Sequence, residues 1–428
     1  MQYYNVHAHL FTMRNAPRNF LSLYMPKFAA HTVDVITNTD VGSWIVRKLL
    51  KVLPGNWGDR YASFLEIGKS SGQMDVFKKL ISQYDDPSMK FIALTQYMEK
   101  CGVEESESGF EGQLEEILKV KQQYPDNLLI FLGVDPRWKA TGKELKEAVE
   151  LYFNTRLKIN DQRSVNPFAG LKIYPSCGFY AFDEKLKETF EWAAKNEVPV
   201  LTHCSYLGGI FTNETAHIKA NLNSLDIYTG KKYADNFPNL SPPAYQQSGG
   251  FWTKLFRQTN TESNKNTCSY FLEPASYETT IDYFSKLDKP LKICLAHYGG
   301  SEHIIAESNS KPFKETLFGM KQENWCKQIK ELMLKYSNVY TDISYAVSNK
   351  DTHQPVLKDV ADPVIGNRIM YGTDFFMTER EMPEKKDYEV FKSQALSFII
   401  GNTNAWEKMA SANTDAFLHS NYYPGKVV

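Results

Sequence analysis

The sequence predicts a (β/α)₈ barrel, and three observations lead to that prediction. Eight short apolar runs recur along the 428-residue chain, each bounded by turn or polar residues. Amphipathic helical patterns follow most of these runs. Side chains that can bind metals stand at the ends of four of them. An open, doubly wound sheet is the alternative arrangement of the same elements.

The apolar runs are predicted to be strands buried on both faces. Their hydrophobicity is nearly continuous rather than alternating, which is typical of a parallel sheet covered by helices. They span residues 3–9, 90–97, 128–135, 169–174, 198–203, 291–297, 338–344 and 368–374.

Periodic apolar positions between the runs predict the covering helices. Residues 113–124 carry apolar side chains at positions 114, 117, 118 and 120, and residues 184–195 place Leu186, Phe190, Ala193 and Ala194 on one stripe. The same pattern recurs over 277–287 and 325–336. Together with the runs, these segments form repeated βα units.

Two connections are too long for one unit. About 80 residues separate the first two runs and about 87 separate the fifth and sixth, on the order of 50 more than a barrel unit requires. We therefore expect insertions over about 11–75 and 204–276. Segments that follow barrel strands lie at the carboxyl face, so these insertions should form the rim of the active site. Residues 1–428 are then one domain.

Composition excludes several classes of protein. The chain has 49 Lys+Arg and 50 Asp+Glu, so no basic excess indicates a nucleic-acid or anionic-membrane partner. No apolar run approaches the roughly 18–20 residues of a membrane span. The six cysteines form no C-x-x-C pair, which favours a reducing compartment. No signal peptide is recognisable, and removing one would delete His7 and His9, so a cytoplasmic protein is expected.

The candidate metal ligands are His7, His9, His203, His297 and Asp374. Because strand side chains alternate between faces, His7 and His9 should point the same way and Ala8 the other. Imidazole and carboxylate ligands suit Zn²⁺, and also Mn²⁺ or Fe²⁺, whereas the absence of thiolates argues against a structural zinc site. A single strand histidine is more often a core residue, but four at strand ends are hard to explain that way.

These residues and their order resemble the amidohydrolase superfamily, in the branch called amidohydrolase family 2, metal-dependent hydrolases of the TIM-barrel fold. The resemblance lies in five motifs and a terminal Ala-Asn pair. They are N-V-H-A-H at 5–9, G-L-K-I-Y-P at 170–175, V-L-T-H at 200–203, L-A-H-Y-G-G at 295–300, M-Y-G-T-D-F at 370–375 and A-N at 412–413.

The resemblance implies four ligands for a divalent metal, which are His7, His9, His203 and Asp374. It implies that Asp374 also accepts the proton of the attacking water, and that His297 binds a second metal or polarises the substrate. In binuclear relatives a lysine at the position of Lys172 is carboxylated and bridges two metals. We favour one ion, most suitably zinc, with manganese or iron as alternatives.

Other residues are candidates for binding the substrate. Arg137 follows the third run, in the sequence Asp135-Pro136-Arg137, and can pair with a carboxylate through both guanidinium branches. Tyr174, Tyr206 and Tyr298 follow strand ends and could line the pocket. Cys204 should turn away from the barrel interior, because it is next to His203 in a strand.

The predicted function is hydrolysis of an amide, ester or lactone bond in a small, carboxylate-bearing molecule by metal-activated water. Non-oxidative decarboxylation or hydration is the alternative, because such enzymes of the same superfamily share this set of ligands. A catalytically silent ligand-binding barrel is the alternative from another class. The expected partner is a small-molecule substrate, and a homodimer is the common default.

Overall fold

The computed structural model describes residues 1–17, 67–68, 70–100, 105–205, 225–232, 271–310, 316–317, 320–321 and 323–424. Most of the two predicted insertions, 11–75 and 204–276, lies outside the described residues, as does Tyr206.

Eight parallel strands form one sheet, and each overlaps one of the predicted apolar runs. In sheet order they are β1 (Tyr4–Ala8), β2 (Lys90–Leu94), β3 (Leu128–Val134), β6 (Phe168–Ile173), β7 (Val200–Ser205), β10 (Ile293–Gly299), β13 (Val339–Asp342) and β14 (Ile369–Met370). Of these, β6, β7 and β10 extend one or two residues beyond their predicted runs. Sheet order equals chain order, as a barrel requires and a doubly wound sheet does not.

The barrel closes between β14 and β1. The Val6 amide donates to the Tyr371 carbonyl at 3.0 Å, and the Asp374 amide donates to the His7 carbonyl at 2.9 Å. An isolated parallel bridge joins Ala8 to Phe375. Because β14 is only two residues long, irregular backbone forms most of this seam, and Asp374 lies four residues beyond the strand.

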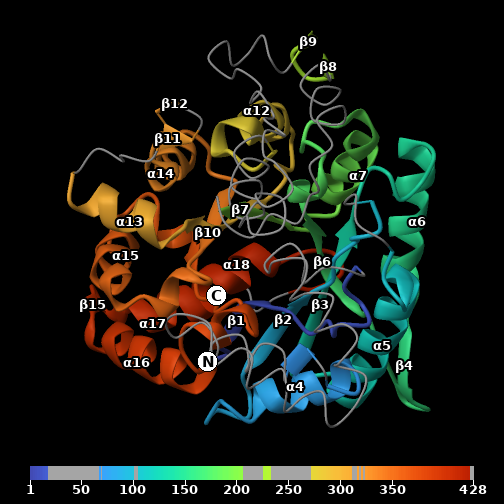
Figure 1. The fold of residues 1–428 in the computed structure, drawn as a ribbon, viewed down its shortest axis with the longest axis horizontal. Helices are drawn as coiled ribbons and strands as arrows, with labels where there is room; N and C mark the ends of the chain where they lie inside the picture. The colour runs from blue at the N-terminus through green and yellow to red at the C-terminus, as the bar shows by residue number, and fades with distance from the viewer. Residues whose placement is uncertain are drawn as a thin grey trace, which may run out of the picture.

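Helices surround the barrel (Figure 1). The helices that follow the strands are α4 (Gln73–Ile81), α5 (Gly109–Gln123), α6 (Gly142–Asn154), α7 (Glu184–Lys195), α12 (Glu278–Ser285), α13 (Ser301–Ser308), α14 (Trp325–Lys335), α15 (His353–Val360) and α16 (Glu384–Ser397). The four predicted helices correspond to α5, α7, α12 and α14. A hairpin of β4 (Leu157–Asn160) and β5 (Arg163–Val165), which the sequence did not predict, precedes β6.

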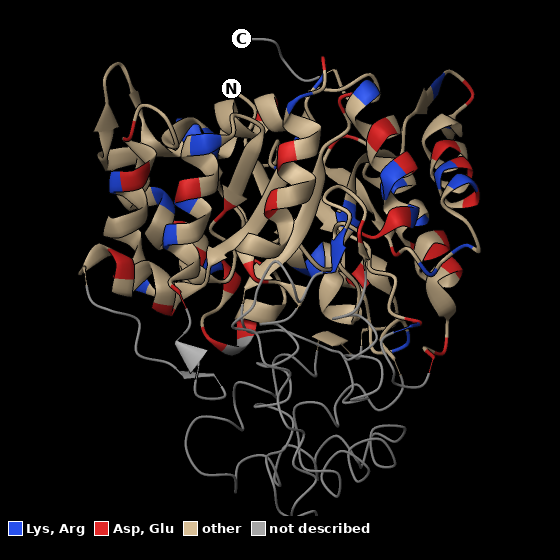
Figure 2. Cartoon of the chain, turned by 90° about the horizontal axis from the view of Figure 1, so that it is seen from above, with Lys and Arg blue, Asp and Glu red and all other residues tan. Residues whose placement is uncertain are grey.

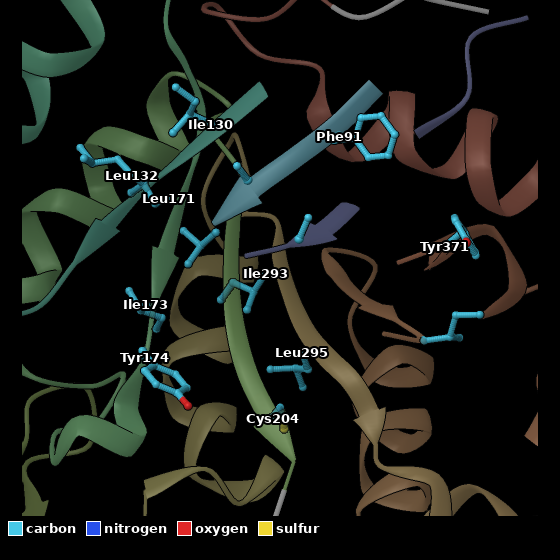
Figure 3. Packing of buried hydrophobic residues seen from close by; sticks show 14 of the residues in the cluster. Phe91, Ile130, Leu132, Leu171, Ile173, Tyr174, Cys204, Ile293, Leu295 and Tyr371 are labelled. Carbon is cyan, nitrogen blue, oxygen red and sulfur yellow. The ribbon is translucent and has the colours of Figure 1, made fainter. Parts of the chain in front are cut away.

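Alternate strand residues pack into two cores. The outer core lies between the strands and the helices; on β3 it takes Ile130 and Leu132, and Figure 3 shows these side chains beside Leu171 of β6. The inner core fills the barrel, and Leu129 and Phe131 of β3 belong to it. Burying a large apolar side chain contributes about 1.5–3 kcal/mol, so both cores stabilise the closed sheet.

The terminal helix α18 (Asn413–Leu418) contributes Phe417 and Leu418 to the inner core. The Phe417 ring lies 5.0 Å from that of Tyr340 and 6.3 Å from that of Phe131. Figure 1 shows α18 over the centre of the barrel. The helix therefore fills one end of the barrel with apolar side chains, so a polar site would lie at the other end.

The outer surface carries mixed charge. Figure 2 shows basic and acidic residues interspersed along the outer helices. Among the described residues, no helix is both long and apolar enough to cross a membrane.

Candidate metal centre

A bulge in β1 aims His7 and His9 at the same point. Val6 belongs to the inner core and Ala8 to the outer core, while the register between β1 and β2 shifts between Asn5 and Ala8. In a regular strand, His7 would point away from the side that Val6 occupies. The bulge turns both histidines inward, a common use of bulges beside functional sites.

Asp374 meets both rings at the end of the barrel seam. Its Oδ1 lies 3.4 Å from Nε2 of His7 and 3.1 Å from Nε2 of His9, and all three side chains are buried. Neither contact to Oδ1 has hydrogen-bond geometry. Tetrahedral zinc with bonds of about 2.0–2.2 Å holds its ligand atoms roughly 3.3–3.6 Å apart. The group therefore fits a cation between the three atoms better than direct hydrogen bonding.

Two residues at the end of β13, which the sequence analysis missed, orient the rings. Oδ2 of Asp342 lies 3.1 Å from Nδ1 of His7, and its Oδ1 accepts from the His297 amide at 3.0 Å. The Ser344 hydroxyl contacts Nδ1 of His7 at 3.0 Å and Nδ1 of His297 at 2.9 Å. Asp342 could have been found by the rule that identified Asp374, because both follow an apolar run near its carboxyl end.

The role of Asp342 follows from the two nitrogens of His7. A neutral ring that donates its Nδ1 proton to Asp342 keeps the Nε2 lone pair for a cation on the Asp374 side. His7, His297 and Asp342 form a second group whose ligand atoms lie within 4.8 Å of one another. We interpret Asp342 as the carboxylate that fixes the orientation of His7.

His203 and His297 form a pair beside this group. Nδ1 of His203 lies 2.7 Å from Nε2 of His297, and the planes of the two rings meet at 65°. The three-residue group of His7, His9 and Asp374 does not include His203. The structure thus brings His203 next to His297 and does not place it among the closest ligand atoms.

Burial sets the protonation of the site. Burial, together with the neighbouring Lys172, lowers the pKa of His7 well below its usual value. Burial and the adjacent His203 do the same for the pKa of His297. Both rings are therefore neutral at pH 7, the form that binds metals. Burial raises the pKa of Asp374, against the opposing effect of His9.

Two of these residues have strained backbone. His297 has φ of 72° and Asp374 has φ of 67°. Such left-handed conformations cost non-glycine residues of order 1–3 kcal/mol and concentrate at functional sites. They turn the two side chains into the site at the strand ends, and the surrounding hydrogen bonds of the seam hold them there.

Lys172 points into the barrel. Its neighbours Leu171 and Ile173 pack in the outer core (Figure 3), so the lysine between them faces inward. Its Nζ is buried, has no hydrogen-bond partner among the described residues, and lies 5.7 Å from the centre of the Tyr174 ring. Burial lowers its pKa to about 8, although Asp342 and Asp374 oppose the shift.

The structure also brings Tyr174 to the site but directs other candidates elsewhere. The Tyr174 ring packs edge-on against His203 at 5.2 Å. Tyr298 lies in the outer core and donates to Asp359 at 3.1 Å. Cys204 also lies in the outer core, as its place in the strand predicted. Tyr206 lies outside the described residues.

The Arg137 guanidinium has several hydrogen-bond partners within the protein. It donates to both carboxylate oxygens of the buried Asp135, at 2.8 and 2.6 Å. It also donates to the carbonyls of Lys100 and Cys177, at 2.8 and 3.0 Å. These contacts join three segments of the chain, and the predicted anion contact at Arg137 stays a prediction.

Solved structures resemble this fold at low sequence identity. A 5-carboxyvanillate decarboxylase from Novosphingobium aromaticivorans, solved with manganese and a nitrobenzoic acid, is 14% identical with a TM-score of 0.47 over 97% of this chain and 96% of that one. A zinc-bound amidohydrolase from Burkholderia multivorans is 10% identical with a TM-score of 0.48 over 98% and 100%. A 4-oxalomesaconate hydratase from Rhodopseudomonas palustris is 11% identical with a TM-score of 0.41 over 99% and 96%.

The comparison of sequences gives the family. No curated protein matches the chain significantly. A family model described as Amidohydrolase matches residues 86–421, more than three quarters of the chain. That match includes β2 to β14, and with them His203, His297 and Asp374, whereas β1 with its two histidines precedes it. The chain therefore belongs to the amidohydrolase family.

Proposed function

We propose that the protein is a metal-dependent hydrolase that holds one divalent cation, most suitably Zn²⁺, with His7, His9, His203 and Asp374. The observation that carries the proposal is the meeting of two histidine nitrogens with one carboxylate oxygen at 3.1 and 3.4 Å without directed hydrogen bonds. Buried neutral imidazoles beside a carboxylate are suitable ligands for zinc, manganese and iron.

The side chains around the cation have distinct tasks. A bound divalent metal lowers the pKa of its water towards about 7 and polarises a carbonyl oxygen. Asp374 would accept the proton of the attacking water; it is a buried carboxylate beside His7 and His9, and burial raises its pKa above the usual value. His297 remains neutral, with Nδ1 beside Ser344 and Nε2 beside His203, and it would polarise the oxygen that gains charge if that oxygen replaced His203 as the partner of Nε2.

The buried position of Lys172 favours a substrate that carries a carboxylate. A buried ammonium without a hydrogen-bond partner among the described residues is costly unless an anion pairs with it. A substrate carboxylate would supply that anion, and so would carboxylation of the lysine itself, which would convert the site to a two-metal design. Tyr174, between Lys172 and His203, would then contact the substrate.

The same lysine favours a second candidate, which is non-oxidative decarboxylation. A substrate carboxylate beside Lys172 would leave as CO₂ if the carbon that it leaves took up a proton, and the same position would also suit a substrate hydrolysed at a nearby bond. Both reactions use the same ligands, so the ligand set alone does not separate them.

Metal content and product analysis test the proposal. Protein purified without added metal should contain about one equivalent of zinc, manganese or iron by elemental analysis, and removal by a chelator should abolish turnover. Lactones, esters and N-acyl amino acids are then screened for acid release, and aromatic and unsaturated carboxylic acids for CO₂ release. Active protein that contains no metal would overturn the mechanism, and CO₂ release without hydrolysis would favour the second candidate. Metal-loaded protein that is inactive on all these substrates would favour a ligand-binding barrel.

A further inference from the structure

Glu384, the first residue of α16, is a fully buried carboxylate that the proposed chemistry does not use. Its Oε1 accepts hydrogen bonds from the Thr373 hydroxyl at 2.7 Å and from Nδ2 of Asn5 at 3.3 Å. The Tyr84 hydroxyl donates to the same oxygen. Three donors from different segments therefore meet on one carboxylate behind the barrel wall.

Asn5 continues this network to both sides of the barrel seam. Its Oδ1 accepts from the backbone amides of His7 and Thr373, each at 3.2 Å. Its Nδ2 donates to the Thr373 hydroxyl at 2.7 Å, and that hydroxyl donates onward to Glu384. One buried amide side chain thus joins the backbone that carries His7 to the backbone immediately before Asp374.

The seam needs such a network because regular strand pairing is almost absent there. β14 ends at Met370, and the backbone bonds between the two sides are few and irregular. His7 and Asp374 approach from opposite sides of this seam, so its geometry sets the separation of two metal-ligand atoms. A regular ladder would fix that separation by itself, whereas here side chains have to do so.

We infer that Glu384 is a positioning residue that, through Thr373 and Asn5, fixes His7 and Asp374 at the spacing that a metal requires. The inference rests on the proposed function. Burial raises the pKa of Glu384 to about 7, and the hydrogen bonds from Tyr84 and Thr373 act against that increase. A buried apolar residue at this position would cost less free energy of folding than a buried carboxylate. The ionisable residue therefore indicates a role in the geometry of the site.

Zinc affinity separates this role from a purely structural one. Thr373→Val keeps the shape of the side chain but removes the hydroxyl that links Asn5 to Glu384, while Thr373→Ser keeps the hydroxyl. The dissociation constant for Zn²⁺ alone is measured by competition with a chelating dye, and the metal-free proteins are unfolded with urea. Loss of a residue that orients metal ligands typically costs about 10–100-fold in metal affinity. We expect that loss for Thr373→Val and for Glu384→Leu, whose side chain cannot accept the three hydrogen bonds, and near wild-type affinity for Thr373→Ser.

Thr414→Val is the matched control, because Thr414 is equally buried and donates to the Met409 carbonyl in the terminal helices. It should lower stability and leave zinc affinity unchanged. If Thr373→Val only lowers stability in the same way, the positioning role is wrong although the metal site stands. If the wild-type protein binds neither Zn²⁺ nor Mn²⁺, the proposed function fails and the positioning role fails with it.

Discussion

Replacing Gly372 with alanine should displace His7 and weaken metal binding. Gly372 lies where the loop after β14 passes β1, and a Cβ at this position would lie 2.9 Å from Cβ of His7 and 3.3 Å from its backbone nitrogen. The Cβ would also lie 3.3 Å from Cγ2 of Val6. The new methyl group therefore meets the strand that carries two of the proposed ligands.

The size of the displacement follows from these distances. Carbon atoms in contact lie about 3.5–4.0 Å apart, so the seam must open by roughly 0.6–1.1 Å at His7. Metal sites tolerate deviations of about 0.2 Å in their ligand distances, which is several times less. The crowding itself should cost about 1–3 kcal/mol of stability. A misplacement of about 1 Å can lower turnover about 100-fold, and we expect zinc affinity to fall at least about tenfold.

Chelator competition and urea unfolding measure the two effects separately. Gly72→Ala is the control, because its Cβ would make only an ordinary 3.5 Å contact with Oε2 of Glu116, far along the chain from the site. It should change neither zinc affinity nor stability by much. A folded Gly372→Ala protein with wild-type zinc affinity would refute the claim that this close approach sets the position of His7.

Three further predictions concern other carboxylates and Arg137. Asp374→Asn should lower turnover at least about 100-fold in steady-state kinetics with the fold intact by circular dichroism, and unchanged turnover would remove Asp374 from proton transfer. Arg137→Gln should destabilise the protein by about 1–3 kcal/mol in urea, because the buried Asp135 carboxylate loses the guanidinium and keeps the backbone amide of residue 137; a raised KM with unchanged stability would instead support the anion contact. Burial raises the pKa of Asp387 to about 8, whereas an unfolded aspartate has a pKa of about 3.9. Between these two pH values the folded protein keeps a proton that the unfolded chain releases. The free energy of unfolding therefore falls as pH rises to 8. The stability of Asp387→Asn relative to wild type should therefore increase from pH 5 to pH 8, and a constant difference across that range would contradict the prediction.

Much of the barrel could be predicted because its signals are local. A run such as 128–135 is apolar over one strand length, and the next helix repeats its apolar positions within a few turns. Both patterns depend on residues close in the chain. The seam was harder, because β14 is two residues long within a predicted run of seven. The tertiary contacts of that segment override its apolar pattern and let Asp374 adopt its left-handed conformation.

The candidate site was predicted only in part. Alternation correctly predicted that His7 and His9 face the same way and that Cys204 turns outward. It did not single out Ser344, because a polar residue near a strand end is common. Asp342 lies near the end of a predicted run, as Asp374 does, but its partners lie elsewhere in the chain. Asp342 is 335 residues from His7, the ring that it orients.

The sequence by itself determined the eight strands, the helices between them and the residue types available for a metal, whereas the order in which the strands pair was decided by the structure. Only the tertiary structure decided which of those residues meet. Periodicity fixes the side of a strand to which a residue points, but the distance between His7 and Asp374 depends on how the two ends of the sheet close. That closure rests on the bulge in β1, on the close approach of Gly372 and on the bonds through Asn5, which act between segments more than 350 residues apart.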